Sequence, residues 1–198
     1  MTGHSSLPGH PDIVRPESIQ QFRMAQLLLV LAAAGESKKR LDLERLAIVE
    51  FLAANPFLVI DTDTTEAEHL RLKGFGRHSI AYASPGQRFV SRRQRVMADV
   101  AQLVAFGLAR LNASAGRRVV DLTEQGRVAE RRLSSVYADA YRASSQTMVP
   151  LVTKLTDVAL YKRLEEWLRS DPVLFDLLDV DDAEQSASAQ ADFEWRQL

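Results

Sequence analysis

The region between residues 82 and 127 constrains the fold of this chain more than any other. An arginine-rich segment runs into an amphipathic helical pattern, which Gly107 brings to an end. Two short apolar runs follow at 108–112 and 117–122, with a glycine-containing turn between them. Thr123 then provides a cap for another helix. The predicted order is therefore helix, strand, turn, strand and helix.

That order is the sequence form of a winged helix, a fold that docks on DNA or on other proteins. We expect a mainly α protein with a winged-helix core and one small β-hairpin, the wing, at about 108–122. Long helices are expected to follow the wing. The composition, with 46% hydrophobic residues, suits a globular chain with a core of its own.

Local signals predict where the helices of the core begin and end. Asp42 can cap a helix that ends at Asn55, because the residue before a proline is disfavoured in the α region. Ser84-Pro85-Gly86 is typical of a turn, and Ser91 is the expected cap of the arginine-rich helix. Its buried stripe is expected to contain Val96, Val100, Leu103 and Val104.

Other helices are expected on both sides of this core. Apolar spacing predicts a first helix after Pro16 that Gly35 stops. Residues 57–60 form a short apolar run, either a strand or a buried connector. A helix is expected from Thr123 to Met148 and another over 151–169, with a proline interrupting the pattern between them.

The chain divides into three regions by composition. Residues 1–16 hold three prolines and two glycines, and we expect a flexible N-terminal arm there. Residues 17–170 carry the apolar helical patterns and form the winged-helix-containing domain. Residues 171–198 form an acidic C-terminal tail.

The absence of cysteine rules out disulfides and thiolate metal sites. The apolar runs are too short to span a membrane, and the first residues lack the features of a signal peptide. We therefore expect a cytoplasmic protein with no membrane association.

Charge is distributed unevenly along a chain whose net charge is −1. Residues 71–95 contain seven basic residues and no acid, whereas residues 171–198 contain eight acids and one arginine. This asymmetry predicts a basic contact face and an acidic tail.

Six arginines are the candidates for contact with DNA or with a partner protein. They are Arg88, Arg92, Arg93 and Arg95 at the start of the basic helix, and Arg117 and Arg118 beside the wing turn. For the arginines of the basic helix, the alternative is a solvated face whose arginines pair with Asp99 or with the acidic tail. For the two arginines beside the wing turn, the alternative is an ordinary exposed hairpin. Candidates for partner docking in the tail are Phe175, Phe193 and Trp195.

No constellation for catalysis is evident. The serine motif lacks the glycines of a nucleophile elbow, the four histidines are scattered, and the paired carboxylates lie in acidic loops. We therefore expect no enzyme activity, no metal, no cofactor and no small-molecule substrate.

Several segments together resemble a known family. Residues 41–58, 82–109 and 134–156 are similar to the middle component of the bacterial ABC-three-component systems, also called Lamassu-type defence systems. The resemblance covers about residues 18–170. It implies a non-catalytic winged-helix subunit that sits on an SMC-like ABC ATPase beside a separate effector, often a nuclease. Such an assembly couples the sensing of foreign phage or plasmid DNA to effector activation.

Carried onto this chain, the resemblance makes Arg88–Arg95 and Arg117-Arg118 contacts for DNA or for a partner, without saying which. Under it we expect Arg92→Glu with Arg93→Glu to abolish immunity and leave the fold intact. The alternative function is a homodimeric winged-helix transcriptional regulator of the MarR or PadR type. Against it, about thirty-five residues, 56–90, separate two helices that a tight turn joins in a standard helix-turn-helix.

Overall fold

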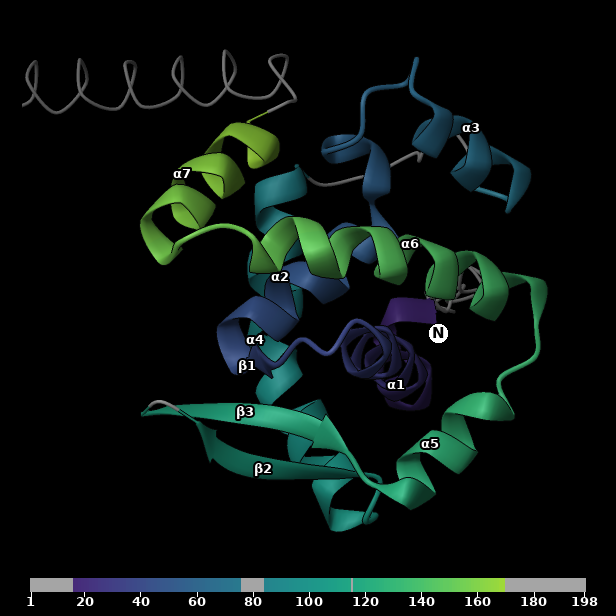
Figure 1. Cartoon of the computed structure of the whole chain (residues 1–198), viewed down its shortest axis with the longest axis vertical. Helices are drawn as coiled ribbons and strands as arrows, with labels where there is room; N and C mark the ends of the chain where they lie inside the picture. Colours follow the sequence, from purple (N-terminus) through teal and green to yellow (C-terminus); the bar gives the residue numbers. More distant parts are fainter. Residues whose placement is uncertain (1–15, 76–83, 115, 170–198) are drawn as a thin grey trace, which may run out of the picture.

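The computed structural model describes residues 16–75, 84–114 and 116–169. Helices dominate this part of the chain, and a three-stranded antiparallel sheet lies at one side of them (Figure 1). The prediction of a mainly α fold with one small β-hairpin is confirmed. The predicted arm and tail lie outside the described residues, apart from Pro16, which opens a short 3-10 helix (Pro16–Ser18).

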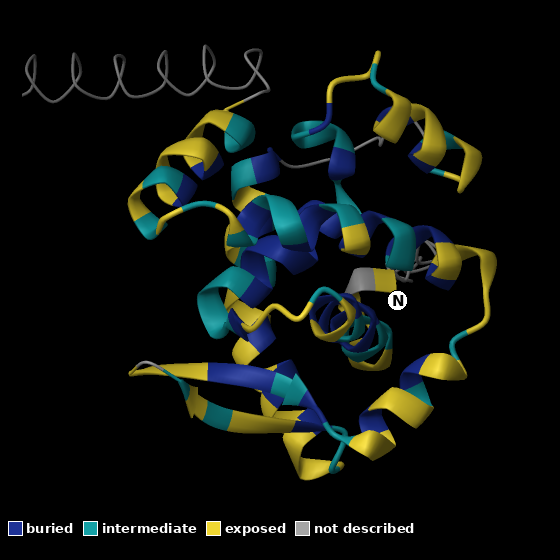
Figure 2. Ribbon diagram, in the orientation of Figure 1, coloured by how far each residue is buried: buried dark blue, intermediate teal, exposed yellow. Residues whose placement is uncertain are grey.

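Helix α1 (Gln20–Glu36) is the centre of the core. Its middle is apolar on every side, and a helix of that kind is stable only when neighbours surround it. Helices α2 (Leu43–Ala54) and α6 (Val136–Thr153) pack against it from one side, and the sheet from the other (Figure 1). Figure 2 shows α1 buried along most of its length, with the exposed residues concentrated in the outer elements.

Helix α2 begins where the sequence predicts. The Asp42 carboxylate accepts a hydrogen bond from the Arg45 backbone N–H at 2.8 Å and so caps the helix. After α2 the chain forms a 3-10 helix (Pro56–Leu58) and helix α3 (Thr65–Leu72). The apolar run at 57–60 is therefore a connector and not a strand.

Helix α4 (Pro85–Ala105) begins about two turns earlier than expected. The cap is Ser84, whose hydroxyl accepts from the Gln87 backbone N–H, and not Ser91. A serine followed by proline and glycine is typical of both a turn and a helix start, because proline suits the first helical position. At the other end Gly107 adopts a positive φ of 69° and ends the helix as predicted.

Helices α2 and α4 pack directly on each other although residues 55–84 separate them in sequence. The rings of Phe51 and Phe89 meet edge to face, with centroids 5.3 Å apart. The long insertion predicted between these two helices is thus present, and it does not prevent their contact.

The sheet contains β1 (Leu41–Asp42), β2 (Ala109–Ser114) and β3 (Arg117–Leu122) in the order β1-β3-β2. Leu111 pairs with Val120, and Val120 pairs in turn with Leu41. Strand β1 was not predicted, because two residues carry no alternating pattern. Together the elements α1, β1, α2, α4, β2 and β3 follow the winged-helix order, with α4 in the position of the recognition helix.

The helices after the wing are α5 (Glu124–Arg131), α6 and α7 (Asp157–Leu168). The prediction of one helix from Thr123 to Met148 is wrong, because Ser135 starts a new helix by accepting from the Ala138 backbone N–H. Pro150 lies inside the last turn of α6 and does not interrupt it. The last helix therefore begins at Asp157 instead of 151.

Candidate docking interface

Arg92 was predicted to be a surface contact residue, and its position in the structure contradicts that prediction. Its side chain is 11% exposed and forms an ion pair with Glu50, which is 3% exposed. Arg92 Nε donates to Glu50 Oε2 at 3.0 Å, and its Nη2 donates to Gln26 Oε1 at 2.8 Å. Burial lowers the pKa of Arg92, but the charge of Glu50 and the hydrogen bonds to it outweigh burial, so the net shift is upward. Arg92 therefore belongs to the core and not to a contact surface.

The ion pair is part of a larger buried network. Gln26 Nε2 donates to the Tyr137 hydroxyl at 2.7 Å, and the Tyr141 hydroxyl donates to the Glu50 carbonyl at 2.8 Å. Burial, followed by the charge of Glu50, raises the pKa of Tyr141. The network joins α1, α2, α4 and α6, so the expectation that Arg92→Glu would leave the fold intact is physically unsound.

The other arginines of the α4 start do not form one patch. Arg88 is half-buried, with its guanidinium carbon 6.0 Å from the centre of the Phe51 ring. Arg93 is exposed and pairs with Glu44 at 2.9 Å, while Arg95 is exposed on the flank of the helix. Asp99, a possible partner of these arginines in the alternative of a solvated face, is buried and is bound by Arg23 at 2.6 Å.

The two wing arginines have different surroundings. Arg117 donates to Asp42 at 2.9 Å and also pairs with Asp157, the first residue of α7. Arg118 is exposed and has no ion pair within the described part of the chain. Of the two predicted wing arginines, Arg118 is thus the one placed as an open wing cation would be.

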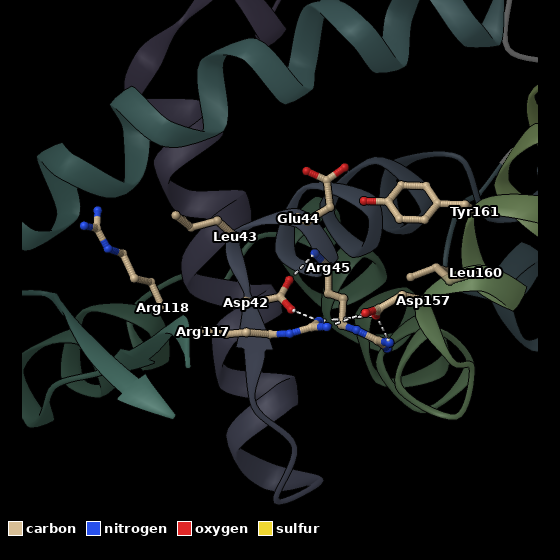
Figure 3. Close-up of a pocket in the computed structure, with 9 residues that line it drawn as sticks. All are labelled: Asp42, Leu43, Glu44, Arg45, Arg117, Arg118, Asp157, Leu160 and Tyr161. Carbon is tan, nitrogen blue, oxygen red and sulfur yellow. Dashed lines mark hydrogen bonds and ion pairs between the residues drawn. The ribbon is translucent and has the colours of Figure 1, made fainter. Parts of the chain in front are cut away.

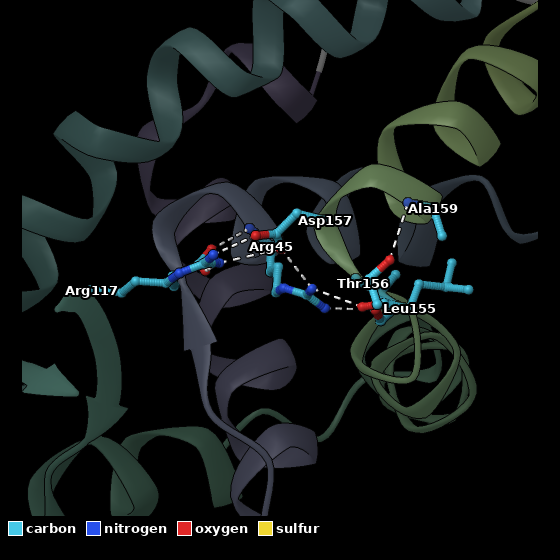
Figure 4. A network of polar contacts seen from close by, with 8 residues as sticks. Arg45, Arg117, Leu155, Thr156, Asp157 and Ala159 are labelled. Atoms are coloured by element: carbon cyan, nitrogen blue, oxygen red, sulfur yellow. Dashed lines mark hydrogen bonds and ion pairs between the residues drawn. The ribbon is translucent and has the colours of Figure 1, made fainter. Parts of the chain in front are cut away.

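A second arginine, Arg45, completes the attachment of α7, and its role was not predicted from the sequence. It donates to the carbonyls of Val152 and Leu155 and to the Asp157 carboxylate, each at 2.8 Å (Figure 4). We call Asp42, Arg45, Arg117 and Asp157 the wing latch. The signal for the wing latch in the sequence is an acid directly after a helix cap. Thr156 caps α7, and Asp157 follows in the first turn of that helix.

The wing latch borders a hollow of about 420 Å³. Leu43, Glu44, Arg118, Leu160 and Tyr161 complete its lining, and Figure 3 shows Arg118 pointing away from the paired groups. Because the latch charges are paired with each other, the hollow offers few polar groups to a small molecule. We interpret the hollow as the boundary between α7 and the winged-helix core.

We expect Asp157→Asn to loosen α7 without unfolding the core. The hydrogen bonds from Arg117 and then Arg45 lower the pKa of Asp157 below its ordinary value of 3.8. Its contribution is therefore complete above about pH 4 and is lost only as pH falls through the folded pKa. Amide hydrogen exchange in α7 should accelerate about two- to fivefold at neutral pH, with little change in core exchange.

Asp139→Asn is the matched control, because Asp139 lies in the first turn of α6 and pairs only with Arg142, at 2.8 Å. Unchanged α7 exchange in Asp157→Asn would show that Leu160 and Leu164, which are buried, hold the helix without the latch.

The second candidate surface is a stripe on the outward face of α4, and the residues of this stripe are uncharged. Val90 and Met97 are 52% and 56% exposed, and Val104 is also exposed. With the exposed Gln94 and Ala101 they follow one another at alternating steps of four and three residues, the spacing of a coiled-coil seam. We call these five residues the α4 seam.

Only the buried side of α4 was predicted from its sequence. Val96, Val100 and Leu103 are buried as predicted, whereas Val104 faces outward. The available signal was a second apolar set on α4, offset from the first, which a helix with a single buried face does not need. On the adjoining strand, Leu111 is likewise exposed.

The tail candidates Phe175, Phe193 and Trp195 lie outside the described residues. Within the described ranges no cluster of three or more potential metal ligands occurs. None of the helices in these ranges has the length and apolar character needed to cross a membrane.

Comparison with known proteins identifies no relative: no family model, no curated protein and no solved structure matches this chain. Interpretation of the α4 seam and the wing latch therefore rests on their own chemistry.

Proposed function

We propose that this protein is a non-catalytic subunit that docks through the α4 seam onto an SMC-like ABC ATPase in a bacterial defence complex. The observation that carries the proposal is the character of the helix in the recognition position. The α4 seam on its outward face is uncharged and partly apolar, and Arg92 in its first half turns inward to Glu50, with a side chain that is 11% exposed. A helix that reads DNA instead aims cations and hydrogen-bond donors at base edges and phosphates.

The sequence resemblance supports the identity of the partner. Middle components of Lamassu-type systems are encoded with an SMC-like ATPase and an effector, often a nuclease, and carry no active site of their own. In this proposal the protein helps to couple recognition of foreign phage or plasmid DNA to effector activation. Arg93, Arg95 and Arg118 remain as exposed cations beside the docked partner, where DNA bound by the ATPase can pass.

We expect Met97→Asp with Ala101→Asp to prevent association with the ATPase from the same locus. Each carboxylate placed in a dry interface should weaken binding at least about tenfold. The test is co-expression followed by mass measurement of the purified complex. Leu72→Asp is the control, because Leu72 is 82% exposed on α3 and lies outside the seam.

Undiminished association of the doubly substituted protein would remove the α4 seam from the interface. A wild-type protein that purifies alone as a homodimer and binds a palindrome near its own promoter would instead establish the transcriptional regulator. Thermal melts of each variant separate loss of docking from loss of fold.

A further inference from the structure

We infer that the acidic segment 171–184 covers the α4 seam in the free protein, so that the ATPase must displace it. The inference rests on the proposed function of the seam and adds a means of regulation. The surface is again the α4 seam, but the occupant is a segment of this chain and not the ATPase.

Charge favours this occupant. Residues 171–198 contain eight acids and Arg196, a net charge of −7 in a chain of net charge −1, so residues 1–170 carry +6. On α4, Arg93 is exposed at the edge of the seam, where it pairs with Glu44, and Arg95 is exposed farther round the helix. The one acid of that helix, Asp99, is buried and paired with Arg23, so it does not repel an acidic segment.

Apolar complementarity favours it as well. Exposed apolar residues gathered on one helix face, as on the α4 seam, mark interaction sites. Segment 171–184 contains six acids, no basic residue and six large apolar residues: Val173, Leu174, Phe175, Leu177, Leu178 and Val180. A segment of this composition suits an uncharged, partly apolar face with an arginine at its edge.

The segment follows α7, a helix that two successive contacts link to α4. Tyr161 of α7 lines the same hollow as Glu44, and Glu44 binds Arg93 of α4 at 2.9 Å. From Tyr161 to the end of α7 the helix advances only about 10 Å. A tethered segment reaches an effective concentration on the order of 1 mM, so even a dissociation constant of about 0.1 mM keeps it bound roughly 90% of the time.

The test uses a single thiol, since the chain contains no cysteine. Ala101→Cys places it in the α4 seam, and the rate of its reaction with a maleimide is measured in the full chain. The same rate is measured after Phe175→Ser with Leu178→Ser, which leaves every charge in place. We expect the second rate to be about tenfold higher, because the covered fraction falls from roughly 90% towards zero.

Leu72→Cys is the control thiol, because it lies on α3 and its rate should be equal in both backgrounds. In 1 M salt the Debye length falls to about 3 Å, so protection of the seam thiol should weaken. Equal rates at position 101 with and without the tail substitutions would overturn the inference. Protection that grows with protein concentration would also overturn it, because a second copy would then be the occupant.

This experiment contains no ATPase, so it separates the two proposals. Protection without any ATPase binding would retain the tail contact and refute the proposed function. ATPase binding without protection would refute only the tail contact.

Discussion

Replacing Arg92 with methionine should lower the free energy of unfolding by about 3–5 kcal/mol, because Glu50 is then left buried without its partner. Arg92 also donates to Gln26, whose amide binds Tyr137, so the loss extends through the network that joins four helices. Urea denaturation at neutral pH measures the change.

Arg93→Met is the matched control, one position along the same helix. Arg93 is exposed and its pair with Glu44 lies at the surface, so the loss should stay within about 1 kcal/mol. Arg92→Met with Glu50→Met should recover much of the stability, because removing both charges leaves an apolar contact. Equal losses for Arg92→Met and Arg93→Met would contradict the buried pair.

Gly126→Ala should destabilise the fold by about 3 kcal/mol or more, through a collision with backbone. A Cβ at Gly126 would overlap the carbonyl oxygen of Leu108 and would lie 3.2 Å from Leu122 Cδ2. That carbonyl already accepts from the Thr123 backbone N–H at 3.1 Å, so it cannot move freely. The melting temperature should fall by about 6–12 °C.

Gly86→Ala is the matched control, because it adds the same methyl group at a glycine where space is available. Gly86 lies in the first turn of α4, and the nearest atom to its added Cβ would be Ser84 Oγ at 4.0 Å. Alanine is the better helix former, so we expect no loss and a gain of up to about 1 kcal/mol. A Gly126→Ala protein as stable as Gly86→Ala would show that the start of α5 can move away from Leu108.

The sequence predicted the elements that local signals determine. Asp42 and Thr123 cap their helices, Gly107 ends α4, and the wing strands lie within two residues of their predicted limits. Each of these features depends on a few neighbouring residues and on the conformations that those residues prefer.

The elements that depend on distant partners were not predictable in this way. Strand β1 exists because Leu41 pairs with Val120, some eighty positions along the chain. Arg92 and Arg93 are adjacent and chemically identical, yet only the first meets Glu50 inside the core. Which arginine is buried depends on the packing of α4 against α2, which periodicity alone does not specify.

The long insertion at 55–84 also means that no short turn dictates the angle between α2 and α4. That angle depends instead on the contact of Phe51 with Phe89 and on the pair of Arg92 with Glu50. The direction in which the α4 seam points is thus a property of the interior. If the α4 seam docks as we propose, conservative core substitutions at these positions should change its direction and weaken assembly, although no residue of the seam itself had changed.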